Sequence, residues 1–411
     1  MKKFVCTIYI LLFSISGLIA QNRFVTSKGK DLVTPSGEKI LLKGTNLGNW
    51  LVPEGYMFKL DQVNAPRHIN ELLEEMVGPD ETKEFWADFI ENYITESDIQ
   101  YLKSIGSNHL RLPFHYKMFT NETYMGRSYH GFEQLDKVVE WCRNAGLYVL
   151  LDMHCAPGGQ TGDNIDDSAG YPFLFESEAS QQQLVDIWRQ IAEHYKDEEV
   201  ILGYGLLNEP IAHYFEDDLP KLNAKLEPLY KRVVASIREV DEEHLVFLGG
   251  AQWNTNFSIF SKPFDDKLVY EFHKYWMPTV KEEIQAYLDF RDKYNVPLYV
   301  GETGENTDEW VKDFRMLLEQ YEINWCFWPY KKMNNTKGVM NFDEPETYQL
   351  ISAYAKSDRS SYAKRRENMP DRDKVRVALK GYLEQCKFEN CYPNKGYVEG
   401  LGLEAKPVKN Q

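Results

Sequence analysis

Eight short apolar runs recur along the chain, and amphipathic stretches separate them. Several runs are continuously apolar, which is typical of strands that are covered on both faces. They lie at Ile40 to Leu42, Asn108 to Leu112, Leu147 to Asp152, Ile201 to Leu207, Leu245 to Leu248, Leu268 to Phe272, Leu298 to Val300 and Ile323 to Phe327. The pattern predicts eight buried strands.

The stretches between the runs have helical spacing. They lie at 132–146, 180–195, 219–240, 280–294 and 307–321. In the first, Leu135, Val139 and Cys142 share one face, and Gly146 is a C-terminal stop. Strands that alternate with helices predict an α/β fold, a (β/α)8 TIM barrel, with the active site at the C-terminal ends of its strands.

The two ends of the chain differ from this pattern. Lys2 and Lys3, an apolar run and then small residues up to Ala20 predict a signal peptide over 1–20 and a secreted protein, extracellular or periplasmic. Turn signals between Phe24 and Glu38 predict a small N-terminal β-hairpin under the barrel. We expect one catalytic domain over 21–390, with polar surface loops from Lys356 to Asp373, and a C-terminal tail over 391–411 that is frayed beyond Gly396.

Composition narrows the class of partner. A net charge of -16 argues against nucleic acid, and no later run is long enough for a membrane anchor. Nine Trp, 26 Tyr and 22 Phe offer flat faces for sugar rings. After signal cleavage five Cys remain, without metal-type spacing. Cys386 and Cys391 either pair or, like the other three, serve as small core residues.

Two carboxylates stand where buried strands end. Glu209 follows Ile201 to Leu207, and Glu302 follows Leu298 to Val300. Cleavage of a glycosidic bond needs one carboxyl group to protonate the leaving oxygen and another to attack or to activate water. Further polar and aromatic residues at strand ends should share the same barrel mouth, namely Arg111, His154, Asn208, His273, Tyr275 and Trp328.

Other readings of these residues stay open at this point. Each of them alone could be a buried partner in a structural network. A non-catalytic sugar-binding barrel would lack one carboxylate, whereas this chain has both. A metal-dependent hydrolase could use His154, His273 and a Glu, but no second His stands beside His154. We therefore expect neither a metal nor a cofactor.

The combined motifs resemble the cellulase family, glycoside hydrolase family 5, over the whole predicted barrel. They are Leu206 to Pro210, His273-Lys274-Tyr275, Gly301-Glu302, Arg111 and His154. The resemblance implies a retaining glycosidase with Glu209 as acid/base and Glu302 as nucleophile. Arg111 and Tyr275 would then stabilise ionised Glu302, His273 would tune Glu209, Asn208 would bind the sugar 2-hydroxyl, and Trp328 would lie under the ring.

Within that family the chain is most similar to the exo-β-1,3-glucanase group. Lys43 to Glu54 resembles that group's opening segment, in which the final acid binds the terminal glucose. The chain departs from the group at His115 and Lys117, where Gly and Trp are usual, and in a longer loop over 162–170. Together with Glu54, the acids at 163–167 are expected to grip sugar hydroxyls.

The expected substrate is a β-glucan or an oligosaccharide. Linkage, sugar identity and exo or endo action stay open, with an endo-β-1,4-glucanase or a mannanase as alternatives, because loops decide them. The oligomeric state also stays open, and a monomer is the simplest expectation.

Overall fold

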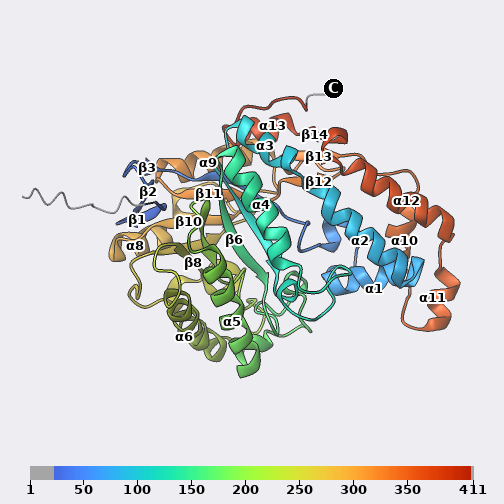
Figure 1. Cartoon of the computed structure of the whole chain (residues 1–411), viewed down its shortest axis with the longest axis horizontal. Helices are drawn as coiled ribbons and strands as arrows, with labels where there is room; N and C mark the ends of the chain where they lie inside the picture. The colour runs from blue at the N-terminus through green and yellow to red at the C-terminus, as the bar shows by residue number, and fades with distance from the viewer. Residues whose placement is uncertain (1–22, 409–411) are drawn as a thin grey trace, which may run out of the picture.

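The computed structural model describes residues 23–408, so the predicted signal peptide lies outside the described residues. Eight parallel strands close into a barrel in the order β10-β11-β4-β5-β6-β7-β8-β9, and helices surround it (Figure 1). The predicted (β/α)8 TIM barrel is confirmed. The strands are β4 (Lys43–Asn46), β5 (His109–His115), β6 (Tyr148–Cys155), β7 (Ile201–Gly205), β8 (Leu245–Gly249), β9 (Leu268–His273), β10 (Leu298–Glu302) and β11 (Asn324–Phe327).

The first barrel strand begins later than predicted. Ile40 belongs to β3 (Lys39–Ile40), which pairs with β2 (Asp31–Val33) in a separate antiparallel sheet. The barrel strand is β4, which reads Lys-Gly-Thr-Asn. That strand carries almost no apolar signal, because Thr45 and Asn46 hydrogen-bond to backbone carbonyls of neighbouring strands instead of packing on apolar neighbours.

The N-terminal sheet caps the barrel. The predicted hairpin, β1 (Thr26–Lys28) and β2, gains β3 as a third strand. Val25 and Leu32 from this segment pack with Leu150, Leu202 and Phe247 from barrel strands. Apolar side chains from the N-terminal segment therefore fill the end of the barrel.

The helices confirm the predicted periodicities and add a second group. Gly146 ends α4 with φ 69° and caps the carbonyls of the last turn, as its position predicted. Helices α1 and α2 pack against α12 and lie beside the barrel (Figure 1). The helices are α1 (Pro66–Val77), α2 (Pro79–Tyr93), α3 (Glu96–Ile105), α4 (Gly131–Ala145), α5 (Glu178–Tyr195), α6 (Leu219–Arg238), α7 (Ala251–Asn254), α8 (Gln285–Tyr294), α9 (Asp308–Gln320), α10 (Gln349–Lys356), α11 (Tyr362–Asn368), α12 (Arg372–Gln385) and α13 (Lys395–Gly400).

Two expectations for the C-terminal part were wrong. The polar segment from Lys356 to Asp373 is not only loop, because it contains α11. The described part of the predicted tail is not frayed either. Residues Tyr392 and Pro393 form β14, which pairs with β13 (Met340–Phe342), and α13 buries Tyr397 and Val398 against the barrel. The C-terminal segments are mostly polar, and their few buried apolar residues are too sparse to produce a recognisable sequence pattern.

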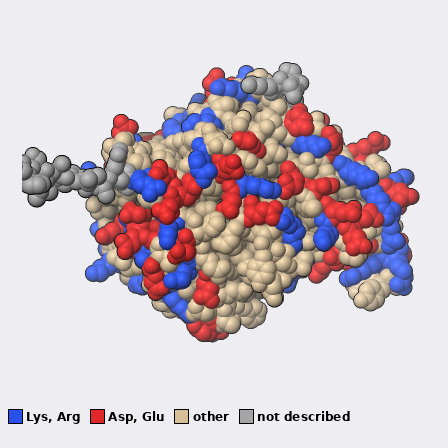
Figure 2. Space-filling view, viewed as in Figure 1, with Lys and Arg blue, Asp and Glu red and all other residues tan. Residues whose placement is uncertain are grey.

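Cys386 and Cys391 are both buried free thiols, as are the other three described cysteines. The core-residue interpretation holds, and the pair is not joined. Within residues 23–408, no helix is long and apolar enough to cross a membrane. On the face drawn in Figure 2, acidic and basic side chains intermingle, and Lys and Arg gather along the edge that α11 and α12 form.

Candidate active site

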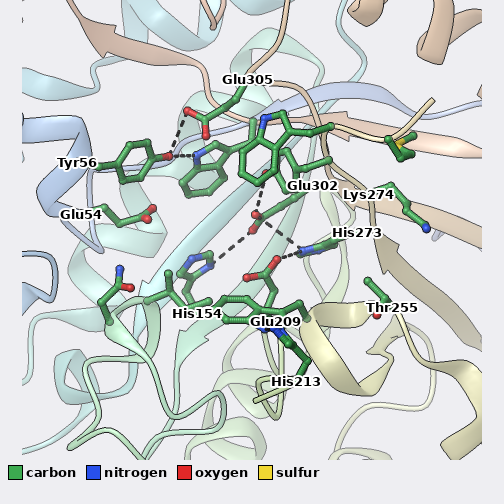
Figure 3. A pocket seen from close by; sticks show the side chains of 17 residues that line it. Glu54, Tyr56, His154, Glu209, His213, Thr255, His273, Lys274, Glu302 and Glu305 are labelled. Carbon is green, nitrogen blue, oxygen red and sulfur yellow. Dashed lines mark hydrogen bonds and ion pairs between the residues drawn. The ribbon is translucent and has the colours of Figure 1, made fainter. Parts of the chain in front are cut away.

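The two predicted carboxylates face each other across one cavity. Glu302 is the last residue of β10, and Glu209 lies four residues beyond the end of β7. Three atoms lie within 4.8 Å of one another: one carboxylate oxygen of Glu209, one of Glu302, and a ring nitrogen of His273. Both side chains line a cavity of about 700 Å³ at the C-terminal ends of the strands (Figure 3). Retaining glycosidases hold their two carboxyl groups about 5–5.5 Å apart.

Glu302 is held by the partners that the sequence predicted. Its Oε1 accepts from Arg111 Nη1 at 2.6 Å, and its Oε2 accepts from the Tyr275 hydroxyl at 3.2 Å. Burial raises the pKa of Glu302, and the charges of His273 and Arg111 oppose this shift. A tight ion pair and a hydroxyl donor both favour the ionised form that a nucleophile requires.

Arg111 also binds two carboxylates that the sequence analysis missed. Its Nη2 lies 2.9 Å from Asp152 and 3.4 Å from Glu271, and all three side chains are almost fully buried. Burial raises the pKa of Asp152 to about 7, although the charge of Arg111 lowers it. Both acids lie within apolar strands, and a buried charge requires a partner of opposite charge. That position could have marked them in the sequence.

His273 links Glu209 to Glu271. Its Nδ1 lies 2.8 Å from Glu209 and its Nε2 lies 3.0 Å from Glu271. Burial lowers the pKa of His273, but the charge of Glu302 and the bonds to Glu209 and Glu271 outweigh burial and raise it to about 10. Both ring nitrogens of His273 are thus engaged by carboxylates, and Glu209, His273 and Glu271 form one hydrogen-bonded network beside Glu302.

His154, Asn208 and Trp328 line the same mouth. His154 Nδ1 donates to Asp152 at 2.9 Å, and its Nε2 accepts from Asn208 Nδ2 at 3.2 Å. The indole of Trp328 stacks on the His154 ring at a centroid distance of 5.6 Å. A side chain at Gly48 would overlap this indole, which explains the glycine beneath it.

Glu54 is buried at one end of the cavity. Its side chain is 5% exposed and its Oε1 has no hydrogen-bond partner. Burial and the charges of Glu302 and Glu305 raise the pKa of Glu54 well above its usual range. Beside it, the Tyr56 hydroxyl accepts from Trp328 Nε1 at 2.8 Å and bonds Glu305, which pairs with Lys332. Tyr56 and Glu305 were not predicted.

The expected grip of the acids at 163–167 on sugar was wrong for two of them. Asp166 accepts from the backbone amides of Thr161, Gly162 and Ser168. Asp167 is bound by His115 at 3.2 Å and Lys117 at 3.4 Å, the two positions that depart from the family pattern. These acids shape the loop, and it is Asn164 and Ile165 that line the cavity.

The opposite end of the cavity carries aromatic residues that the sequence analysis also missed. Trp253 follows β8, and Trp276 follows Tyr275 with 70% of its surface exposed. The sequence did not predict them, because Trp253 lies in the short turn α7 and Trp276 in a loop, and the apolar pattern predicts the course of neither. A barrel mouth with two facing carboxylates, buried polar partners and aromatic walls defines a glycoside hydrolase.

Comparison with known proteins identifies the same class of enzyme. Residues 74–334 match the family described as cellulase (glycosyl hydrolase family 5), and the chain belongs to that family. It is therefore a retaining glycoside hydrolase that acts on β-glycosidic bonds.

Several curated proteins are similar to this chain. A beta-xylosidase of Phanerodontia chrysosporium is 29% identical over 366 residues, covering 80% of this chain and 75% of that protein. Endoglucanase C of Acetivibrio thermocellus is 27% identical and covers 66% and 94%. A probable glucan 1,3-beta-glucosidase A of Aspergillus clavatus is 25% identical and covers 76% and 79%.

Among solved structures, the rutinosidase from Aspergillus niger superposes with a TM-score of 0.58. Its sequence is 19% identical, and the match covers 71% of this chain and 90% of that chain. The likeness supports the fold.

Proposed function

We propose that this protein is an exported retaining β-glycosidase that removes a terminal β-linked glucosyl unit from a glucan or oligosaccharide. The observation that carries the proposal is Glu54, whose carboxyl points into the cavity (Figure 3) and whose Oε1 is a buried atom without a hydrogen-bond partner. A buried polar atom without a partner costs about 1–3 kcal/mol. A hydroxyl of a terminal sugar would remove that cost. The export signal is the segment 1–20.

The reaction follows from the two carboxylates. Glu302 attacks the anomeric carbon while Glu209 donates its proton to the leaving oxygen, and a covalent glycosyl-enzyme forms. Glu209, now ionised, takes a proton from water. That water attacks the anomeric carbon, and Glu302 departs. Two displacements at one carbon retain its configuration.

The surrounding residues have matching roles in this proposal. Arg111 and Tyr275 keep Glu302 ionised, and His273 orients Glu209. Asn208 is placed to bind the sugar 2-hydroxyl, and Trp328 lies under the ring beside His154. Tyr56 and Glu305 line the same cavity as Glu54 and are joined by a hydrogen bond, which supports a closed end and action at a chain end.

The test is the product profile from a panel of purified β-glucans with different linkages. Monosaccharide from the first minutes, with the anomeric configuration of the substrate by NMR, is the expected result. Oligosaccharides of mixed length at the start would show internal cleavage, and an inverted product would exclude the covalent step.

A matched pair of variants tests the roles of the acids. Glu302→Gln fills the same space but cannot attack, so turnover should be lost while the fold remains. Glu209→Ala should recover part of its activity with azide, or on substrates whose leaving groups need no proton. Turnover like that of wild type in Glu302→Gln, or a folded Glu209→Ala without rescue, would remove the residue from its role.

A further inference from the structure

The segment that contains α11 and α12 carries a charge opposite to that of the whole chain. Residues 356–387 contain ten Lys and Arg against five Asp and Glu, in a protein whose net charge is -16. The basic side chains gather along one edge of the molecule (Figure 2). That edge lies at the end opposite the N-terminal sheet (Figure 1). Residues 356–387 therefore form a basic edge on an acidic protein.

The acids of the basic edge are already occupied, but several of its cations are not. Each acid accepts hydrogen bonds from a donor in the same segment, and the acids are Asp358, Glu367, Asp371, Asp373 and Glu384. Four exposed cations make no side-chain hydrogen bond or ion pair with any residue of 23–408, namely Arg366, Arg372, Lys374 and Lys380. These four charges have no partner that would stabilise the fold.

The free cations also stand where a helix disfavours them. Arg372 and Lys374 lie in the first turn of α12, and the N-terminal end of a helix has a partial positive charge. Arg372, Arg376 and Lys380 follow one another at intervals of four, so like charges are neighbours on one flank of the helix, which is destabilising. Charges that cost stability and have no partner inside the protein point to a partner outside it.

Exposed apolar groups accompany these charges. Helix α11 has no buried residue, and Tyr362 at its start is 77% exposed, with the guanidinium of Arg365 5.7 Å from the centre of its ring. On α12, Val377 is 58% exposed. Aromatic and aliphatic groups among basic side chains are typical of protein surfaces that lie on a membrane, where the ring sits at the level of the lipid headgroups.

A lipid surface fits this edge better than a sugar chain does. Small ligands bind in concave pockets, and none of residues 356–387 lines the catalytic cavity. Attraction to anionic headgroups acts over about one Debye length, roughly 8 Å at physiological salt. The cations of an outer edge can approach a surface within that range. The acidic barrel behind them lies farther from the surface, where salt screens its repulsion.

We propose that the basic edge binds an anionic lipid surface and holds the enzyme on it by one end. Arg366, Arg372, Lys374 and Lys380 face the phosphate groups, and the ring of Tyr362 enters the headgroup layer. The binding is peripheral and reversible. It is independent of the proposed function, because no residue of the catalytic cavity takes part.

Cosedimentation with vesicles tests the surface. The protein without its segment 1–20 should pellet at low salt with vesicles of equal parts phosphatidylcholine and phosphatidylglycerol, and it should stay in solution with phosphatidylcholine alone. Salt at about 1 M should release it, because the Debye length falls to about 3 Å. Absence of binding at low salt, equal binding to both vesicles, or binding that resists salt would overturn the proposal.

A matched pair of variants locates the binding. Replacing the four free cations together by Gln should raise the dissociation constant for the anionic vesicles at least about tenfold. The control replaces four exposed lysines of other segments by Gln, at Lys28, Lys262, Lys312 and Lys337, and changes the net charge equally. Its affinity should stay within about twofold of wild type, and both variants should keep their activity on an aryl β-glucoside. Equal losses of vesicle affinity in the two variants would overturn the basic edge as the binding surface.

Tyr362→Ser separates the apolar contribution from the electrostatic one. It should raise the dissociation constant about threefold and leave the salt dependence unchanged, because it removes no charge. An acidic polysaccharide is the alternative partner, and polygalacturonate tests it. Retention of the protein on polygalacturonate, without binding to the anionic vesicles, would assign the edge to that polymer and overturn the lipid proposal.

Discussion

At the scale of single residues, Glu54 illustrates a conflict between stability and ligand binding. Its carboxyl is buried beside other acids, and one of its oxygens has no partner. A group whose pKa is raised on folding binds its proton more tightly in the folded state, so ionising it at neutral pH destabilises the fold. The same oxygen is free for a sugar hydroxyl. Sites that bind ligands often carry such a cost.

Replacing Glu54 with Gln should therefore separate the two effects. We expect the melting temperature to rise by about 1–3 °C, because a neutral amide removes the penalty of ionisation. In contrast, kcat/KM on a β-glucoside should fall about ten- to a hundredfold, since a charged hydrogen bond contributes about 1.5–3 kcal/mol. Differential scanning calorimetry and steady-state kinetics measure both. Unchanged kinetics on every β-glucoside tested would exclude Glu54 from sugar binding.

Most site residues could be predicted because they lie in or directly after the apolar runs. Glu209, Glu302 and His273 stand at or after the ends of such runs, Arg111 lies within one, and the structure places all four around one cavity. Asp152 and Glu271 lie within strands and become visible only when Arg111 is placed between them. Trp253 depends on a left-handed turn that no sequence period encodes.

At the scale of elements, the buried carboxylate of Asp167 ties the loop over 162–170 to two other segments of the chain. Asp167 accepts from the backbone amide of Arg67 at 3.0 Å and is bound by His115 and Lys117. Cys155 donates its thiol to the carbonyl of Ile165, which ties the loop to the end of β6. Three separate segments therefore hold Asn164 and Ile165 in the cavity wall. The sequence predicts the length of the loop and the unusual residues at His115 and Lys117, but not that Asp167 binds both of these side chains.

Replacing Asp167 with Asn should loosen this loop. A buried acid that binds two basic side chains cannot be matched by an amide, so we expect a loss of about 1–3 kcal/mol in unfolding free energy. KM for an oligosaccharide should rise while kcat on a small aryl glucoside is retained, because the catalytic acids are untouched. Urea unfolding and kinetics report the two effects, with the exposed Glu178→Gln as control. An equal loss of activity on the oligosaccharide and on the aryl glucoside would argue against a role of Asp167 in shaping the cavity wall.

At the scale of the whole molecule, three buried histidines set the response to acid. Burial lowers the pKa of His109 to about 3 and those of His130 and His154 to about 4. In the unfolded chain each would bind a proton near pH 6.5. Between about pH 4 and 6.5 the unfolded state binds more protons, so their contribution to stability is complete above pH 6.5 and is lost as pH falls.

We expect the unfolding free energy to fall below pH 6.5, with a slope of up to about 3 kcal/mol per pH unit, because proton uptake by Asp152 in the folded state opposes the effect of the three histidines. His130 is the site to test, since neither of its ring nitrogens has a hydrogen-bond partner. His130→Leu should keep the stability at pH 7 and reduce the slope by up to about 1.4 kcal/mol per pH unit. Denaturant titrations from pH 5 to 7 measure this. A slope unchanged in the variant would mean that His130 binds its proton as readily in the folded protein as in the unfolded chain.

The C-terminal segment has a consequence for anyone who shortens this protein. The Tyr397 hydroxyl on α13 donates to the backbone carbonyl of Trp328 at 3.1 Å, and Gly304 makes room for that hydroxyl next to the end of β10. Trp328, the proposed sugar platform, is thus braced by a residue that composition alone assigns to the C-terminal tail. A fragment that stops at residue 390 would keep every strand of the barrel and both proposed catalytic carboxylates. It would lose the brace behind the indole, so a minimal enzyme should retain the chain at least through α13.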